Sequence, residues 1–519
     1  ISGSWFFWQD EERQHSVNTT DGDGRSIIAV LPFEDLSGQG HDDWLPLAFT
    51  DEIINRINAY PDLVALDFES VRHSLIEQRL QNEQAPVYRV TGKLLPAPVG
   101  TRVRVRMTDA LGNVGWEHEQ VFTLMDAQTL SAAQKWVAGH VAAGLGLSLA
   151  GVDYCEPSSN ARATELYLNA RERFSQRGPE NVATAAQMLE EATRLDPYFA
   201  RGLELLSEVY QRFPRWVMQD PSHYGMNKEE LERFLRGQPE LEAAKRALDL
   251  CPTLGAAYFT VEISAPVQHS YADAVDIMEE AIRRDPANVI LRGRMVEFLL
   301  RVGHVKWADE VAQEMYLRDP LSTRVPHVLG WTQDMLGNLD RSIELDHESL
   351  NLGYRLENIL PQISSTYVSL ADNRGLERLL GESFEPSGRI PVDPREVLAA
   401  QSDQKLKENL IETYRELVNS GDPNILRSLS GWAGRSLALD LGDEELAWLI
   451  MEKWAEMAGA GGMPIAFWNA QYRHWFGNSR LLEMDGYLSL WADFWDRKGP
   501  PDGCKWDGRN LTCEWADYQ

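Results

Sequence analysis

The sequence has little positive charge and few cysteines. Its 519 residues hold 50 lysines and arginines against 79 aspartates and glutamates, a formal net charge of −29. Because such a field repels phosphate backbones, we expect no nucleic-acid binding by this chain. The 4 cysteines are too few for a disulfide scaffold. A hydrophobic fraction of 43% and a charged fraction of 25% are globular values and exclude a disordered or collagen-like chain.

Catalytic and cofactor motifs are also absent. The sequence has no Gly-x-Ser-x-Gly elbow, no Walker loop and no Gly-x-Gly-x-x-Gly. His118-Glu119 opens like a zinc-protease helix, but Phe122 stands in place of the second histidine. No histidine has a cysteine at metal-ligand spacing. We therefore expect no enzyme, no metal and no cofactor.

Long apolar runs are missing from the interior of the chain, so no internal segment is expected to span a membrane. The first eight residues differ. Ile1 to Trp8 resembles the last turns of a transmembrane helix, because Trp prefers the headgroup layer; the alternative is an apolar end packed on its own domain. No Lys/Arg cluster follows, which favours an extracytoplasmic position. Residues 1–25 are thus predicted to be the end of a membrane anchor that begins before Ile1, plus a linker.

The cysteines fall into two pairs of different character. Cys504 and Cys513 lie nine positions apart around a polar turn, a spacing that a disulfide can close, and disulfides persist in oxidising compartments. Two free surface thiols are the alternative. Cys155 and Cys251 lie far apart at predicted helix boundaries, where we expect single buried thiols, with a second bridge left open.

Residues 26–150 alternate strand and helix and predict an α/β domain with a mixed sheet. Arg102, Arg104 and Arg106 alternate with apolar residues, so one strand should turn its arginines outward, as a solvated sheet face or as an anion site. Strands are predicted at 26–31, 63–66, 88–94, 102–107 and 114–122, and helices at 44–59, 71–80 and 126–144.

Residues 151–380 carry a repeat whose mark is a helix-closing proline. Pro252, Pro286 and Pro320 follow one another at intervals of 34 residues, the tetratricopeptide period. Pro197 precedes Pro252 by 55 residues, so an insertion is expected within 213–237. The segment predicts an all-α tetratricopeptide-type solenoid, whose stacked helix pairs leave a concave binding surface.

Residues 381–519 lose the period and are predicted to be degenerate helical repeats and a cap, with helices at 406–417, 425–441, 444–457, 464–476 and 481–497. Nine of the 17 tryptophans lie from Trp432 onward. They are expected in the core or cap, with a glycan or partner platform as the alternative.

The repeat period also places residues on the concave face, where polar and aromatic side chains suit a peptide clamp or stacking on a sugar. Ordinary exposed helix residues are the alternative. The candidates are Phe259, Glu297, Arg301, Arg324, His327, Trp331 and Asp334.

Several motifs resemble a known bacterial family. IAVLPFEDLS (28–37), TDEII (50–54) and YRVTG (88–92) are similar to the TolB-like domain that precedes tetratricopeptide arrays, and FWDRKGPPDGC (494–504) is similar to the ending of the same proteins. The resemblance implies the extracytoplasmic region of ToxR/CadC-type membrane-bound transcription regulators, or a module that follows class III nucleotide cyclases. It supplies no catalytic residue. The insertion at 213–237 and the tail after Cys504 depart from the family, so ligand specificity does not carry over.

Taken together, the sequence predicts a sensor or interaction module on the periplasmic side of the bacterial inner membrane. Its partner would be a protein or peptide, with a small ligand or glycan as the alternative, and oligomerisation is compatible with it. A periplasmic scaffold of an envelope complex and an appendage of a nucleotide cyclase remain the other two hypotheses.

Overall fold

The computed structural model describes residues 26–37, 44–60, 63–71, 88–109, 111–123, 127–146, 155–176, 178–214, 217–264, 270–381, 392–421, 438, 440–458 and 487–513. Residues 1–25, where the anchor is expected, lie outside this set. Within it no helix is both long and apolar enough to cross a membrane. The described chain is mixed α/β and mostly helical.

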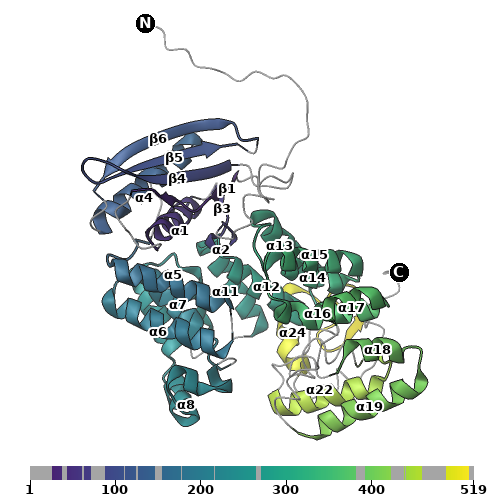
Figure 1. Ribbon diagram of the computed structural model, residues 1–519. Helices are drawn as coiled ribbons and strands as arrows, with labels where there is room; N and C mark the ends of the chain where they lie inside the picture. The colour runs from purple at the N-terminus through teal and green to yellow at the C-terminus, as the bar shows by residue number, and fades with distance from the viewer. Residues whose placement is uncertain are drawn as a thin grey trace.

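One mixed sheet of six strands forms the N-terminal part of the described chain (Figure 1). Its strands are β1 (Ser26–Val30), β2 (Glu34–Asp35), β3 (Leu63–Ala65), β4 (Tyr88–Pro96), β5 (Thr101–Thr108) and β6 (Val114–Phe122). The order is β3-β1-β4-β5-β6, with β2 beside β4. β1 is parallel to β3 and β4, whereas β4, β5 and β6 form the predicted antiparallel meander. The two-residue strand β2 was not predicted.

The arginine stripe of β5 is paired within the sheet. Val103 and Val105 are buried and the arginines between them face outward, as predicted. Glu119 of β6 lies 3.6 Å from Arg102 and 3.0 Å from Arg104, and Glu117 lies 2.5 Å from Arg106. Because each guanidinium already has a carboxylate, the structure favours the solvated sheet face over an anion site.

Helices α1 (Trp44–Asn58) and α4 (Ala127–Gly144) pack against each other below the sheet (Figure 1). Ile53 and Ile57 of α1 are fully buried, which follows from their spacing of one helical turn on the apolar face. The short helix α2 (Phe68–Val71) follows β3. Most of the helix predicted at 71–80 lies outside the described residues.

Paired helices follow the sheet, and each packs against the next along the chain. They are α5 (Ala161–Gln176), α6 (Pro179–Leu195), α7 (Ala200–Tyr210), α9 (Pro239–Leu250), α10 (Gly255–Ile263), α11 (Tyr271–Arg284), α12 (Val289–Arg301), α13 (Val305–Arg318), α14 (Val325–Leu336), α15 (Leu339–Asn351), α16 (Leu356–Ser369) and α17 (Asn373–Leu380).

The predicted turns end helices at the residue before each proline. α6, α9, α11 and α13 have as their C-caps Asp196, Cys251, Asp285 and Asp319. A residue before proline is driven out of the α conformation by the proline ring, and Asp196 has φ −136° and ψ 91°. Its N–H still donates to the carbonyl of Ala192. The four predicted helix ends are therefore confirmed, and the following proline explains each of them.

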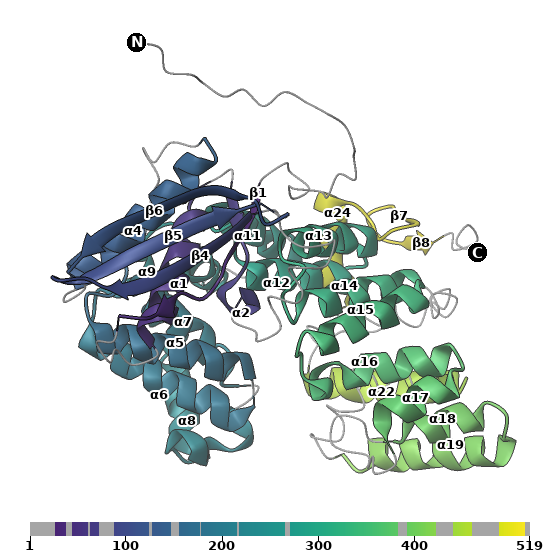
Figure 2. The ribbon, with the colours of Figure 1, turned by 45° about the horizontal axis from the view of Figure 1, so that its top comes forward.

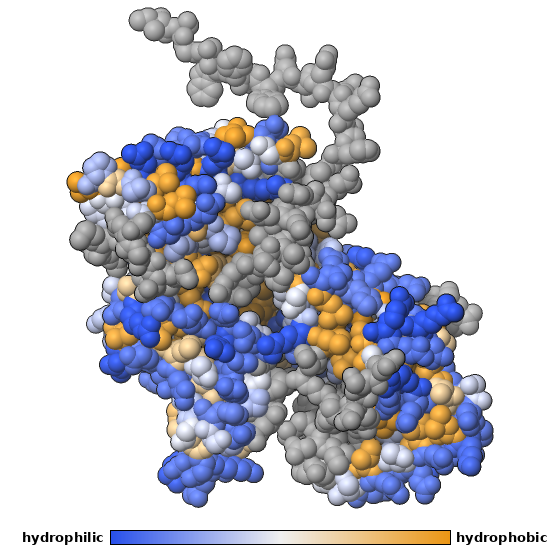
Figure 3. Space-filling model, viewed as in Figure 1, coloured by the Kyte–Doolittle hydropathy of each residue, from blue (hydrophilic) through white to orange (hydrophobic). Residues whose placement is uncertain are grey.

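The predicted insertion forms short helices between α7 and α9: η1 (Val217–Gln219), η2 (Pro221–Tyr224) and α8 (Lys228–Arg236). Phe213 anchors it, because its ring packs edge-on against Tyr210 at 5.2 Å and Tyr224 at 4.8 Å. A capping box between Asn227 and Glu230 starts α8. The tip around α8 is hydrophilic on the face seen in Figure 3.

The C-terminal part turns back on the middle of the helices. Its elements are α18 (Pro394–Ala400), α19 (Gln404–Asn419), α22 (Glu444–Ala458), α24 (Tyr487–Lys498), β7 (Cys504–Trp506) and β8 (Leu511–Cys513). α24 packs on α11, and the β7–β8 hairpin lies near α13 (Figure 2). The predicted helices at 425–441 and 464–476 fall largely or wholly outside the described residues.

Several C-terminal tryptophans belong to this packing. Trp448, Trp491 and Trp495 are each 2% exposed and join the core of α10 to α15. The Trp495 indole N–H donates to the carbonyl of Val302 at 3.1 Å. For these three residues the core prediction is confirmed, and a glycan platform would need other tryptophans.

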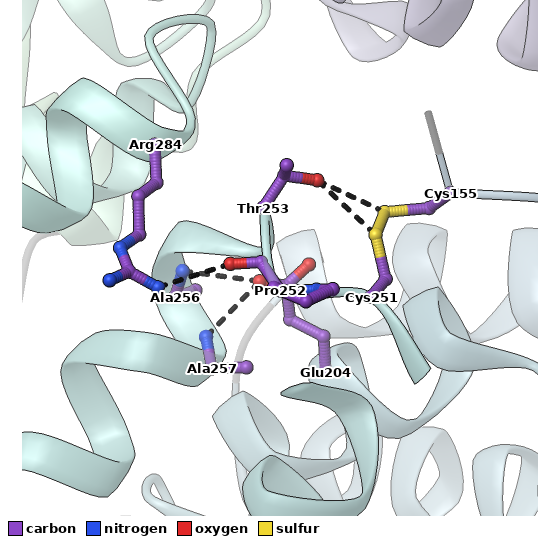
Figure 4. The surroundings of a disulfide bond; sticks show 8 residues. All are labelled: Cys155, Glu204, Cys251, Pro252, Thr253, Ala256, Ala257 and Arg284. Carbon is purple, nitrogen blue, oxygen red and sulfur yellow. Dashed lines mark hydrogen bonds between the residues drawn. A yellow bond between two sulfur atoms is a disulfide. The ribbon is translucent and has the colours of Figure 1, made fainter. Parts of the chain in front are cut away.

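Cys155 and Cys251 form a disulfide, with their Cα atoms 5.6 Å apart, so the prediction of two single thiols is wrong. The helices between α5 and α9 return the chain, which places the turn after α9 beside the segment that enters α5. The Thr253 hydroxyl lies 3.2 Å from Cys251 Sγ and 3.5 Å from Cys155 Sγ (Figure 4). Cys504 and Cys513, the predicted pair, are joined across the β7–β8 hairpin.

The two disulfides should differ in their effect on stability. Cys155–Cys251 spans 96 residues and Cys504–Cys513 spans 9. In the chain-entropy description a loop near 100 residues gives about 4.7 kcal/mol, and the short loop gives about 2 kcal/mol less. We predict that the C155S/C251S variant loses more free energy of unfolding in urea than the C504S/C513S variant. An equal loss, or the reverse order, would contradict this account.

Candidate functional site

The sheet domain (residues 26–146) and the first helices share one apolar core. Buried side chains extend from Ile27 of β1 through α1 and α4 to Ala243 of α9. A continuous core of this kind fixes the orientation of two parts, whereas separate cores permit relative motion. Polar groups where the two parts meet are removed from water and need hydrogen-bond or ion-pair partners within the protein.

The turn that begins α2 binds two helices far apart in the sequence. Asp319, which caps α13, accepts hydrogen bonds from the N–H of Asp67 at 3.0 Å and the hydroxyl of Ser70 at 2.7 Å. Arg171 of α5 lies 3.4 Å from Asp67 and 2.5 Å from Asp51 of α1. We call these five residues the α2 junction. It ties α5 and the end of α13 to one point of the sheet domain.

The electrostatics of the α2 junction are set by burial. Removal from water raises the pKa of Asp319 to about 7, the nearby charge of Asp67 adds to the rise, and the hydrogen bond from Ser70 opposes it. Asp319 is 3% exposed, so its carboxyl group has little access to water. The pair Arg171 and Asp51 is also shielded, with side-chain exposures of 17% and 9%.

A second carboxyl group, half-buried, lies below the disulfide. Glu204 of α7 accepts hydrogen bonds from the N–H groups of Ala256 and Ala257, both at 3.1 Å, at the start of α10 (Figure 4). Burial raises the pKa of Glu204 to about 8, and the charges of Asp285 and Glu208 add to the rise. The first turn of α10 thus gains an acceptor for its unpaired N–H groups.

Two of the predicted concave-face residues are buried. Phe259 of α10 is 6% exposed, packs edge-on against Phe298 and lies 5.4 Å below the guanidinium of Arg294. Asp334 of α14 is 3% exposed and accepts a hydrogen bond from Thr366 of α16 at 3.1 Å. Both side chains are used in contacts between helices.

Three other predicted residues lie along α12 and the start of α14. Glu297 and Arg301 form an ion pair at 2.6 Å, one helical turn apart. Arg324 lies against Gly293 of α12, where an added Cβ would make an ordinary van der Waals contact with its guanidinium at 3.5 Å. Arg324 therefore borders the same surface as the residues of α12.

His327 and Trp331 complete the predicted set on α14. His327 Nδ1 lies 2.8 Å from Asp346 Oδ1, and Asp346 is fully buried. With the proton on Nδ1, Nε2 keeps its lone pair for a ligand. The ring of Tyr354 lies 5.6 Å from that of His327, and Trp331 is partly buried beside the core.

The sequence did not reveal that Asp346, Tyr354 and Arg294 contact the predicted residues. Asp346 lies on α15, the second helix of its pair, which the repeat period assigns away from the concave face. Tyr354 follows α15, where the period marks only a loop. Arg294 could have been predicted, because it is three residues before Glu297 on α12 and so lies on the same side of the helix.

In the described part of the chain, no group of three or more His, Cys, Asp or Glu side chains could hold a metal ion. The fold defines a mixed sheet domain fixed to packed helix pairs that present a charged and aromatic surface. No protein-family model matches the chain, and no curated protein is significantly similar to it.

The α2 junction gives a prediction for Arg171. In R171M the buried carboxylate of Asp51 loses its positive partner and, among the described residues, keeps only the hydrogen bond from Asn55, so we expect a loss of about 3–5 kcal/mol in the free energy of unfolding. The control is R162M, since Arg162 is 60% exposed and pairs with Glu165 on the surface of α5. That variant should change stability by about 1 kcal/mol or less. Similar losses in the two variants would contradict the role of the junction.

Glu204 gives a prediction for pH. Its folded-state pKa, about 8, is above the ordinary value of 4.5, so the folded protein binds the proton more tightly than the unfolded chain. Its contribution is therefore complete below about pH 4.5 and is lost as the pH rises to about 8. Stability measured by urea unfolding should fall over this range more steeply in the wild type than in E204Q. E229Q, at an exposed position of α8, should follow the wild type. Parallel profiles for wild type and E204Q would refute this.

Proposed function

We propose that the chain is the signal-receiving extracytoplasmic module of a membrane-anchored bacterial regulator. In this proposal a TolB-like sheet domain holds a tetratricopeptide-type solenoid, which binds a protein or peptide partner and passes the change through the N-terminal linker. The module itself carries out no catalysis. A small ligand or glycan is the alternative occupant.

The helix ends support the solenoid. Cys251, Asp285 and Asp319 cap three helices at intervals of 34 residues, and consecutive helices pack along the chain. This recurrence is the observation that carries the proposal, because it makes helix pairs the repeated unit and a concave surface their consequence.

The cysteines support the compartment. All four cysteines pair in two disulfides. Disulfides of this kind persist in secreted and periplasmic proteins and are rare in the reducing cytoplasm. Together with the apolar first residues, they favour the periplasmic side of an inner membrane over a cytoplasmic appendage.

The surface of α12 and α14 suits a peptide. Arg324 brings a guanidinium charge to the start of α14, Arg301 shares its charge with Glu297, and His327, oriented by Asp346, offers a ring nitrogen. Trp331 adds a flat apolar face. Acidic side chains or the carboxyl terminus of a partner would match these groups.

The test uses the full-length protein in its own cells. We predict that deletion of the gene changes a defined set of transcripts and that H327A/W331A reproduces much of this change at an unchanged protein level. The matched control is K405A/K407A on α19, away from this surface. Thiol alkylation of the native protein should also find all four cysteines unreactive.

Two outcomes would replace the proposal. If the deletion leaves transcription unchanged but alters the composition of an envelope complex, the chain is a scaffold. If it changes only cyclic-nucleotide levels and the cysteines react as free thiols, the chain belongs to a nucleotide cyclase. An H327A/W331A variant that signals normally would remove the concave face from the account.

A further inference from the structure

A pocket of about 350 Å³ lies between α11, α12 and α13. It is separate from the predicted concave face, since its α12 residues are Arg292 and Met295, on a different side of the helix from Glu297 and Arg301. A volume of this size is at the lower end of the range for small-molecule sites.

Four of the eight residues that line the pocket are apolar. Ile282 of α11, Met295 of α12, and Trp307 and Val311 of α13 line it. Met295 is 2% exposed, while the other three are partly exposed. An indole ring beside a thioether and two branched side chains favours a flat apolar group over a sugar or a bare ion.

The pocket is also lined by Arg292 and Glu314, which we call its floor. Arg292 lines the pocket with its side chain 4% exposed, and it lies 3.3 Å from Glu314 Oε1. Arg318, also 4% exposed, takes the same oxygen atom at 2.8 Å. One carboxylate oxygen therefore serves two buried guanidinium groups, and Arg292 also donates to the carbonyl of Pro286. Burial, with the charge of Arg318, lowers the pKa of Arg292 to about 10, while the charges of Glu314 and Asp285 oppose the fall.

The acidic residue at the edge of the pocket is already engaged. Glu279 of α11 lies 3.5 Å from the ammonium group of Lys498, which also lies 2.6 Å from Asp276. Lys498 of α24 thus neutralises the acidic group that would otherwise attract a basic ligand to this edge of the pocket. Arg283, which pairs with Glu280 and has 69% of its side chain exposed, adds a further guanidinium to the lining.

We propose that this pocket binds a small monocarboxylate with a flat apolar or aromatic body. The ligand carboxylate would pair with Arg292 at the floor, and the body would pack on Trp307, Met295, Ile282 and Val311. A ligand carboxylate would add a negative charge beside Arg292 and Arg318, which share one oxygen of Glu314. A guanidinium fork also matches a carboxylate in geometry. This site stands independently of the proposed function.

The test is isothermal titration of the full chain with three probes of one shape: 3-phenylpropionate, 3-phenylpropanamide and 3-phenylpropylamine. The carboxylate should bind with one site per chain, and the amide should bind at least about tenfold more weakly, since it cannot form a charged pair. The amine should not bind measurably.

Matched variants locate the site. V311W fills the pocket from α13 and should abolish binding of 3-phenylpropionate. The control is L317W on the same helix, because Leu317 is 41% exposed and does not line the pocket; it should bind like the wild type. R283A should weaken binding by a few fold, and near-ultraviolet circular dichroism confirms that each variant is folded.

Three results would overturn the proposal. The first is tighter binding of the amine than of the carboxylate, which would mean that Glu279 and Glu314 govern the site. The second is unchanged affinity in a folded V311W variant. The third is no heat of binding from any probe at millimolar concentration. None of these would bear on the concave face, whose residues are different.

Discussion

Asp319 receives two hydrogen bonds from the turn at Asp67 and Ser70, and the same turn meets Arg171. The rest of the described structure depends on this junction, because Arg171 lies near the start of the helices and Asp319 some 150 residues later. A helical array alone can vary its curvature, since each pair contacts only its neighbours. Binding α5 and the end of α13 to one rigid point removes that freedom for the helices between them.

The turns that end the helices also bind the sheet domain and the segment that connects it to α5. Asp319 binds the α2 turn, and Asp196 accepts hydrogen bonds from the hydroxyl of Ser158 at 2.6 Å and the N–H of Ser159 at 2.8 Å. At the equivalent position of the next turn stands Cys251, bonded to Cys155. A hydrogen-bonded aspartate and a disulfide thus both attach the segment before α5 to a helix-ending turn. The C-terminal helix α24 packs on α11 and so holds the middle of the array as well.

Local patterns predicted most of the helices and strands, because alternation in β5 and proline at each helix end act within a few residues. The disulfide between Cys155 and Cys251 was missed, since the pairing exists only after several helices have returned the chain. The concave face was assigned by helix phase alone. Phase cannot show that Phe259 and Asp334 are covered by neighbouring helices, or that Asp346 reaches His327 from the second helix of its pair.

The central claim is that the α2 junction sets the geometry of the helical array. Spin labels at position 229 on α8 and at the exposed position 310 on α13 would report, by pulsed electron resonance, a distance within the part of the array that the junction constrains. The account predicts one narrow distance distribution in the otherwise wild-type protein, and a broader or shifted one when Ser70 is replaced by alanine and Asp319 by asparagine. Identical distributions in the two proteins would contradict it.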